Sequence, residues 1–194
     1  REKHDIVEYW DDYIAEARKC GYKMLAWNVW DKLDSGSIGM ASAFFPIRHE
    51  WIFVFGTEFY EINLTIPKKE ESMNARNYRT VRQADGTIKR TTTGDQTKPL
   101  KQMESVLPLS CEKRNENRAL HPAVFPVALP SEYIMSMSNK NDVVIDPFGG
   151  SGTTLIACEQ TNRICYMMEI DPHYIDVIIE RWENLTGEKA LLTN

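Results

Sequence analysis

The stretch Asn141–Thr154, NDVVIDPFGGSGTT, decides how the rest of this chain is interpreted. Its run Val143–Ile145 is β-branched and typical of a buried strand. The run ends at Asp146-Pro147, the turn Gly149–Gly152 follows, and Thr153 opens a helix. Glycine lets a backbone approach a ligand, and a helix start presents unpaired N–H groups. The pattern predicts a nucleotide-type cradle, with a tight connection that binds nothing as the alternative.

Two common kinds of glycine turn do not fit this stretch. It has no GK[ST] sequence, which excludes a triphosphate-binding loop, and its glycines are spaced G-G-x-G rather than G-x-G-x-x-G. The carboxylate of Asp146 at the strand end suits a cationic ligand better than a pyrophosphate.

A second strand supports the cradle. Arg163–Ile170, RICYMMEI, is an apolar run that reaches Glu169, and a helix is expected from Pro172 to about Leu185. A carboxylate at the end of the second strand of a βαβ unit, about 20 residues past the glycines, is placed to accept hydrogen bonds from ribose hydroxyls. The alternative is a solvated charge at a strand end.

Three motifs in this order carry a resemblance. They are HPAVFP at His121–Pro126, DPFGGSGTT at Asp146–Thr154 and MEIDPHY at Met168–Tyr174. The chain resembles the C-terminal portion of DNA amino-methyltransferases of the adenine-N6 and cytosine-N4 type, in which the catalytic half precedes the S-adenosylmethionine half. The resemblance is strong over His121–Asn184 and looser over Tyr9–Phe55.

The resemblance implies an α/β fold with a Rossmann-like, mostly parallel methyltransferase sheet, helices on both faces and a basic recognition insert. It implies S-adenosylmethionine as cofactor, with Phe125 as an apolar wall beside the methionine end. Met167 stands where the family often has glycine. The residues that the resemblance assigns to the cofactor are His121, Pro122, Phe125, Asp146, Pro147, Phe148, Gly149, Gly150, Ser151, Gly152, Thr153 and Glu169.

The implied reaction is methyl transfer to an exocyclic base amine in double-stranded DNA, with adenine N6 favoured over cytosine N4, as in restriction-modification. Such enzymes flip the base out and align its nitrogen with the methyl group. The family tetrapeptide D/N/S-P-P-Y/F/W, which grips the amine, does not occur here. We therefore expect a fragment, inactive alone and with an incomplete sheet. Because the sheet would have open edges, the isolated chain is expected to aggregate, to form a homodimer, or to need the N-terminal half or a partner chain.

Two other functions remain open. A non-catalytic subunit that binds cofactor or DNA would also lack the tetrapeptide. A nicotinamide oxidoreductase would share Glu169 but requires the G-x-G-x-x-G turn that the chain lacks.

The charge distribution divides the chain of 194 residues, whose net charge is −5. Residues 67–101 hold nine basic and four acidic side chains, a local +5 against −10 elsewhere. We expect residues 1–66 to complete the catalytic half, 67–120 to form a target-recognition insert and 121–194 to bind cofactor. Within the insert, Asp85-Gly86 predicts a hairpin over Tyr78–Thr92 that neutralises DNA phosphates, with a solvated surface insert as the alternative. The candidate DNA-binding residues are Lys68, Lys69, Arg76, Arg79, Arg82, Lys89 and Arg90.

The first 66 residues predict a helix and several extended segments. Apolar spacing indicates a helix over Asp5–Cys20, and aromatic runs indicate strands over Tyr22–Trp30 and His49–Phe55. A loop is expected over Leu33–Ala43 and an extended segment over Tyr60–Ile66.

Two pairs in this region have two interpretations each. His49 and Glu50 either orient the extruded base or form a strand-start pair that bonds a neighbouring loop. Trp27 and Trp30 are interpreted as core residues rather than platforms for base stacking. Further along, His121–Ser138 predicts a turn and a helix, with Pro126 in its first turn and a break or kink at Pro130.

Composition excludes other classes of protein. The four cysteines, Cys20, Cys111, Cys158 and Cys165, form no C-x-x-C pair, so neither a zinc site nor a disulfide framework is indicated and no metal is expected. Reduced thiols favour a cytoplasmic protein. No apolar run approaches membrane-spanning length, and the charged REKHD start is not a signal peptide.

Overall fold

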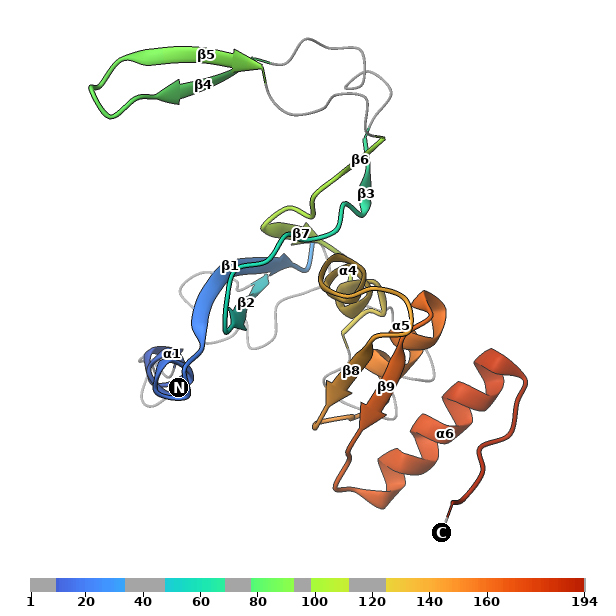
Figure 1. Cartoon of the computed structure of the whole chain (residues 1–194). Coiled ribbons are helices and arrows are strands. Elements are labelled where there is room, and N and C mark those ends of the chain that lie inside the picture. The colour runs from blue at the N-terminus through green and yellow to red at the C-terminus, as the bar shows by residue number, and fades with distance from the viewer. Residues whose placement is uncertain (1–9, 34–47, 69–77, 93–98, 112–124, 194) are drawn as a thin grey trace.

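The structure is a computed structural model that describes residues 10–33, 48–68, 78–92, 99–111 and 125–193. In its first part β1 (Lys23–Asp31) is the middle strand of a three-stranded sheet (Figure 1). β2 (His49–Gly56) pairs with it antiparallel along its length. β7 (Val106–Pro108) pairs with it in parallel at Val29–Asp31, so the chain returns to this sheet after a long excursion.

The two tryptophans of β1 lie on opposite faces of this sheet. Trp30 is 4% exposed, packs with Leu107 and Leu129, and donates its indole N–H to the Leu109 carbonyl at 2.7 Å. Trp27 is 47% exposed and stacks edge-on against Trp51 at 5.4 Å between ring centroids. The core interpretation is therefore confirmed for Trp30, whereas Trp27 belongs to a half-exposed aromatic cluster.

The first helix contacts that aromatic cluster through its first residue. α1 (Trp10–Lys19) begins with a tryptophan whose ring meets Trp51 edge-on at 4.8 Å between centroids. It has no buried residue. The expected helix is confirmed over these residues. The expected residues 5–9 of this helix, and most of the loop expected over Leu33–Ala43, lie outside the described residues.

The C-terminal part is a βαβα unit, as the glycine-turn pattern predicts. β8 (Val143–Asp146) and β9 (Ile164–Met167) pair in parallel, and α5 (Thr153–Thr161) connects them. α6 (Pro172–Thr186) begins at an Asp171 side chain that accepts a hydrogen bond from the His173 amide. It ends at Gly187 in the left-handed conformation, the usual glycine stop.

One helix joins these two parts. α4 (Ala128–Met137) packs Leu129 into the cluster around Trp30 and Ile134 against Ala157 and Cys158 of α5. The expectation of a break at Pro130 was wrong, and so was the placement of Pro126 inside the helix. Pro130 is the third residue of α4, where the N–H has no partner within the helix and a proline costs no hydrogen bond.

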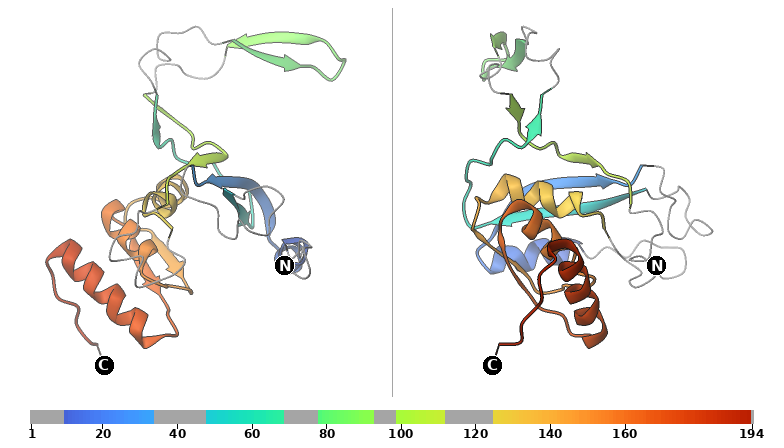
Figure 2. Two further views of the ribbon diagram at one scale, coloured as in Figure 1. Left: turned by 180° about the vertical axis from the view of Figure 1, so that it is seen from behind. Right: turned by 90° about the vertical axis from the view of Figure 1, so that its right-hand side faces the viewer.

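A long two-stranded arm stands away from the rest of the molecule (Figures 1 and 2). We call residues 66–101 the arm. Its base pairs β3 (Ile66–Pro67) antiparallel with β6 (Leu100–Lys101). Its tip is the hairpin of β4 (Tyr78–Arg82) and β5 (Ile88–Thr92), as predicted. Of the extended segment expected over Tyr60–Ile66, only Ile66 enters a strand.

The strand pairings differ from one continuous parallel sheet. Two pairings, β1 with β7 and β8 with β9, are parallel, and they lie in separate sheets of the described residues. The other pairings are antiparallel. Among the described residues, no helix is long and apolar enough to cross a membrane.

Candidate functional site

The glycine turn lies at the carboxyl ends of β8 and β9. The Gly149 amide donates to the Met168 carbonyl at 2.8 Å, and the Gly152 amide donates to the Gly149 carbonyl at 2.8 Å. Gly150 and Gly152 have φ angles of +53° and +81°, which residues with a Cβ rarely adopt. The turn is closed by its own backbone and delivers the chain into α5.

Two glycines are also required by close neighbours. A Cβ on Gly149 would lie 2.7 Å from the Met167 side chain, and one on Gly152 would lie 3.0 Å from that of Ile178. Met167, which stands where the family that the chain resembles often has glycine, is therefore accommodated by a glycine opposite it. The β8–β9 pairing continues through the Asp146–Met167 pair, so Met167 does not disturb the strand.

Glu169 joins the turn to the end of β9. Its Oε2 accepts a hydrogen bond from the Gly150 amide at 2.6 Å. Its Oε1 accepts from the amides of Ile170 and Asp171 at 2.8 and 3.0 Å. The carboxylate therefore lies beside the glycine turn in a fixed orientation, which a solvated strand-end charge would not have.

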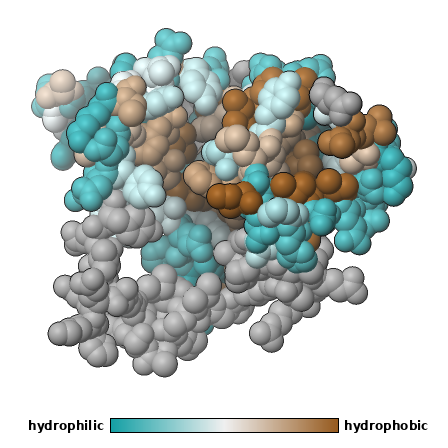
Figure 3. Space-filling view, turned by 90° about the horizontal axis from the view of Figure 1, so that it is seen from below, coloured by the Kyte–Doolittle hydropathy of each residue, from teal (hydrophilic) through white to brown (hydrophobic). Residues whose placement is uncertain are grey.

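Asp146 and Phe148 form the entrance to the same turn. The half-buried Asp146 carboxylate accepts a hydrogen bond from the Phe148 amide at 2.9 Å. This contact forms an Asx-type turn that directs the chain away from β8. Phe148 is 86% exposed, and Ile170, after Glu169, is 97% exposed. Figure 3, seen from below, shows hydrophobic surface on this side of the molecule. The carboxylates are thus accompanied by apolar side chains open to a ligand.

Arg181 of α6 also contacts the turn, which the sequence did not lead us to predict. Its Nη1 donates to the Ser151 carbonyl at 2.5 Å and to the Ser151 Oγ at 3.1 Å, and lies 3.5 Å from the Thr153 Oγ1. Ser151 and Thr153 are both buried. The available signal was a cation three residues after Ile178, on the apolar face of an amphipathic helix.

The HPAVFP motif is only partly described. His121 and Pro122 lie outside the described residues, whereas Phe125 is half-buried and packs against the cluster of Trp30, Leu107 and Leu129. Its ring therefore contacts the part of the chain that contains β1.

The residues expected near the target base lie at the end of β1 and the start of β2. Lys32, almost fully buried, forms an ion pair with Glu50, and its Nζ lies 5.0 Å from the centroid of the Trp30 ring. His49 is exposed, with its ring 6.3 Å from that of Trp51. The pairing with Lys32 gives Glu50 a structural partner that neither interpretation of His49-Glu50 included.

The hairpin has an ordered turn and exposed cations. The Asp85 Oδ1 accepts hydrogen bonds from the Thr87 amide and hydroxyl at 2.9 and 2.6 Å, which hold the pKa of this carboxyl below its ordinary value. Arg82 and Lys89 are exposed beside the turn. For Arg79 and Arg90 only the backbone is described, Lys68 lies at the arm's base, and Lys69 and Arg76 lie outside the described residues.

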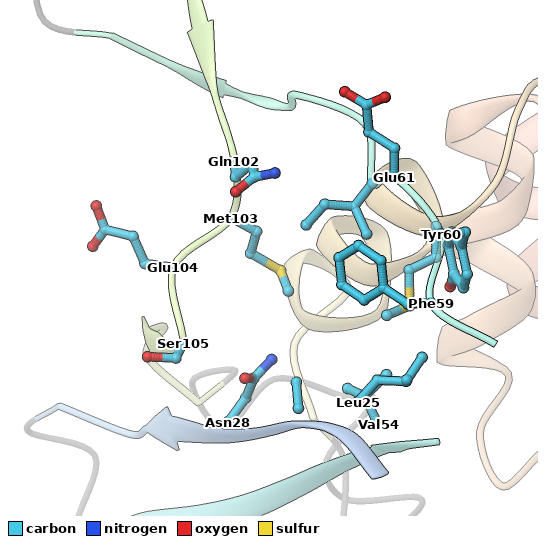
Figure 4. Close-up of a pocket in the computed structure, with 13 residues that line it drawn as sticks. Leu25, Asn28, Val54, Phe59, Tyr60, Glu61, Gln102, Met103, Glu104 and Ser105 are labelled. Carbon is cyan, nitrogen blue, oxygen red and sulfur yellow. The ribbon is translucent and has the colours of Figure 1, made fainter. Parts of the chain in front are cut away.

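A cavity of about 380 Å³ lies at the root of the arm, apart from the glycine turn (Figure 4). Phe59–Ile62 and Gln102–Ser105, the segments before and after the arm, line it together with Leu25 and Asn28 of β1. Phe59 and Met103 point into it, while Glu61 and Glu104 point away. Among the described residues no group of three or more potential metal ligands occurs.

About a third of the chain is similar in sequence to bacterial methyltransferases. The orphan methyltransferase M.BamHII of Bacillus amyloliquefaciens is 45% identical over 64 residues, which are 33% of this chain and 24% of that protein. The type II methyltransferase M.HpaI of Haemophilus parainfluenzae is 40% identical over 70 residues, 36% of this chain and 22% of that protein. These matches span about a quarter of the relatives' length.

Solved structures share the fold. The M1.HpyAVI–SAM complex superimposes with a TM-score of 0.60 at 21% identity, covering 91% of this chain and 71% of that one. The cytosine-N4-specific PvuII DNA methyltransferase gives a TM-score of 0.59 at 19% identity, covering 89% of this chain and 56% of that one. The fold is thus that of a Rossmann-like methyltransferase. Residues 3–180 match the profile of the N6/N4 family described as DNA methylase.

Proposed function

Since this chain belongs to the N6/N4 DNA methylase family, we propose that it binds S-adenosylmethionine and serves in methyl transfer to an exocyclic base amine of DNA. The observation that carries the proposal is the hydrogen bond from the Gly150 amide to the Glu169 carboxylate. It brings the acceptor suited to a ribose beside the turn suited to an amino-acid carboxylate.

The residues around the turn match the chemistry of this cofactor group by group. The start of α5 offers backbone amides to the α-carboxylate, and the half-buried Asp146 offers a carboxylate to the cationic end. Glu169 offers acceptor oxygens to the ribose, and the exposed Phe148 and Ile170 offer apolar surface to the adenine ring. We also propose His121, Pro122 and Phe125 as part of the wall at the methionine end.

When bound, S-adenosylmethionine supplies an electrophilic methyl group. The residues of this chain then have a positioning task, because holding two reactants in line supplies much of the rate gain in such transfers. The glycine turn and Glu169 hold two ends of one ligand and thereby restrict its rotation. The buried Lys32, paired with Glu50, would fix that carboxylate where a flipped base could meet it.

The arm is proposed to contact double-stranded DNA. A two-stranded β-ribbon fits the major groove, and exposed arginines and lysines neutralise phosphates. Arg82 and Lys89 lie beside an ordered turn at the end that projects furthest from the body (Figure 2). We retain residues 67–120 as the recognition segment, between residues 1–66 of the catalytic half and residues 121–194 of the cofactor half.

Adenine N6 is proposed as the target amine, with cytosine N4 as the alternative. In the test, the protein encoded by the full reading frame is incubated with labelled S-adenosylmethionine and mixed-sequence duplex DNA. The DNA is then digested and its nucleosides are separated. Label in N6-methyl-2′-deoxyadenosine supports the proposal, label in N4-methyl-2′-deoxycytidine supports the alternative, and a calorimetric titration showing no cofactor binding would refute both.

A second candidate function is a non-catalytic subunit that binds cofactor or DNA, because these 194 residues contain no D/N/S-P-P-Y/F/W tetrapeptide. We propose that the 194 residues alone bind cofactor but transfer no methyl group, acting in the cytoplasm with an N-terminal half, a partner chain or a second copy. Methyl transfer only by the protein encoded by the longer reading frame would support the enzyme as the function. Transfer by neither, with cofactor still bound, would support the subunit.

A further inference from the structure

Arg181 reaches from α6 into the glycine turn. Its guanidinium donates to a buried backbone carbonyl and a buried hydroxyl of Ser151, and lies near the hydroxyl of Thr153. A planar guanidinium with several fixed donors suits such a cluster of acceptors better than an ammonium does. The interaction connects a helix near the C-terminus with residues 28 to 30 positions earlier.

The same face of α6 fixes the turn in a second way. Ile178, one helical turn before Arg181, is buried and would lie only 3.0 Å from a Cβ on Gly152. The Trp182 indole N–H donates to the Glu159 carboxylate of α5 at 3.0 Å, which holds the two helices together. α6 is therefore the support against which the turn rests, and Arg181 is its polar contact.

The position of this cation is electrostatically unusual. Ser151 and Thr153 are at the N-terminal end of α5, which carries the positive end of the helix dipole. The helix dipole disfavours a cation at a helix start, so Arg181 is held there by its hydrogen bonds to Ser151 and not by the dipole. Two sources of positive potential at one place favour an anionic ligand group there.

We propose that Arg181 is a positioning residue that holds the glycine turn and attracts the α-carboxylate of the cofactor, the only anionic group of S-adenosylmethionine. The inference rests on the proposed cofactor and goes beyond it by assigning a role to α6. Arg181 acts through the backbone of Ser151 and through its charge.

The test compares two ligands that differ only in that carboxylate, S-adenosylmethionine and decarboxylated S-adenosylmethionine. Each is titrated calorimetrically into the 194-residue chain and its Arg181→Gln and Arg181→Lys variants. Arg181→Gln should lower the affinity for S-adenosylmethionine about tenfold and change the affinity for the decarboxylated ligand by less than about twofold. Arg181→Lys should recover part of the affinity, because it retains the charge without the planar fork.

Arg163 provides a matched control. It too is an arginine bonded to backbone carbonyls, those of Thr161 and Ser138, but near the C-terminal end of α5. Arg163→Gln should leave both affinities unchanged, and circular dichroism should show every variant folded. Equal affinity of Arg181→Gln and the unaltered chain, or equal weakening of both ligands, would overturn the inference. Failure of the unaltered chain to bind either ligand would overturn the cofactor assignment itself, and the inference with it.

Discussion

At the scale of single residues, Glu169 combines two tasks. Its carboxylate holds the Gly150 amide and is also the acceptor proposed for the cofactor ribose. Loss of a charge-assisted hydrogen bond costs about 1.5–3 kcal/mol. We expect Glu169→Ala to lower the affinity for S-adenosylmethionine about ten- to a hundredfold, as measured by calorimetric titration.

The two tasks can be separated with Glu169→Gln. Glutamine keeps the size and one acceptor oxygen, so the turn should stay closed and thermal unfolding should change less than in Glu169→Ala. Affinity should still fall, because the charge is removed. Unaltered affinity in Glu169→Ala would remove this residue from the site.

Cys158 and Cys165 lie under the cradle, between α5 and β9. Burial, together with the neighbouring Cys158 sulfur, raises the pKa of the Cys165 thiol from 9.0 to about 12, and burial also raises the pKa of Cys158. A thiol reacts as its thiolate. At pH 8 we therefore expect iodoacetamide to label the exposed Cys20 while Cys158 and Cys165 stay unlabelled, as peptide mass mapping would show.

The raised pKa also predicts a pH-dependent stability. Between pH 9 and 12 the unfolded thiol loses its proton while the folded one retains it, so the stabilisation is complete below pH 9 and is lost as pH rises towards 12. Urea unfolding from pH 8 to 10.5 should show a steeper decline in the unfolding free energy for the unaltered chain than for Cys165→Ala. Parallel declines would contradict the assignment.

At the scale of elements, the hairpin allows a test by salt. If β4 and β5 grip DNA, replacing Arg79, Arg82, Lys89 and Arg90 with Gln should weaken duplex binding. The slope of log affinity against log salt should shrink by about 0.9 for each phosphate that the variant no longer neutralises. Fluorescence anisotropy over a salt series measures this slope.

The control removes the same charge elsewhere. Exposed cations outside the arm are available, namely Arg18, Lys19, Lys140 and Lys189. Their replacement with Gln should preserve the slope. Equal slopes for both variants would assign the hairpin to the solvated surface.

Elements with local signals were predictable from sequence. The glycines indicate the turn between β8 and α5, Asp171-Pro172 indicates the start of α6, and Asp85-Gly86 indicates the hairpin. Pro130 misled because a proline signals a helix end or a helix start, and the correct choice depends on where α4 begins. Arg181 was not predicted, because its acceptors are 28 to 30 residues away and only packing of α6 brings them together.

At the scale of the molecule, α4 connects the two hydrophobic core clusters, because it contributes a residue to each. Leu129 packs in the cluster of Trp30, and Ile134 packs in that of Cys158. Neighbouring elements are fastened to α4 as well, since the Asn28 amide donates to the Tyr133 hydroxyl and Asn63 donates to the carbonyls of Met135 and Ser138. Such long-range interactions left no pattern in the sequence, so the parallel return of β7 to β1 was not predicted either.

The base of the arm has a consequence for how such proteins change. Pro67 faces Leu100, and the Lys68 amide donates to the Pro99 carbonyl at 2.8 Å, so the chain leaves and re-enters the body through neighbouring residues. Residues 69–98 can then be replaced by Asn-Gly, a two-residue hairpin turn. We expect cofactor affinity to persist and DNA binding to vanish, by calorimetry and anisotropy. Loss of cofactor binding would show that the body depends on the arm.

Because the arm leaves and re-enters the body at adjacent, hydrogen-bonded residues, it can be exchanged as a unit. If the arm contacts DNA as proposed, recombination between relatives at these two positions would replace the DNA-contacting segment, with no compensating substitutions in either core cluster. Acquisition of a new target site would then be a single genetic event rather than a gradual drift.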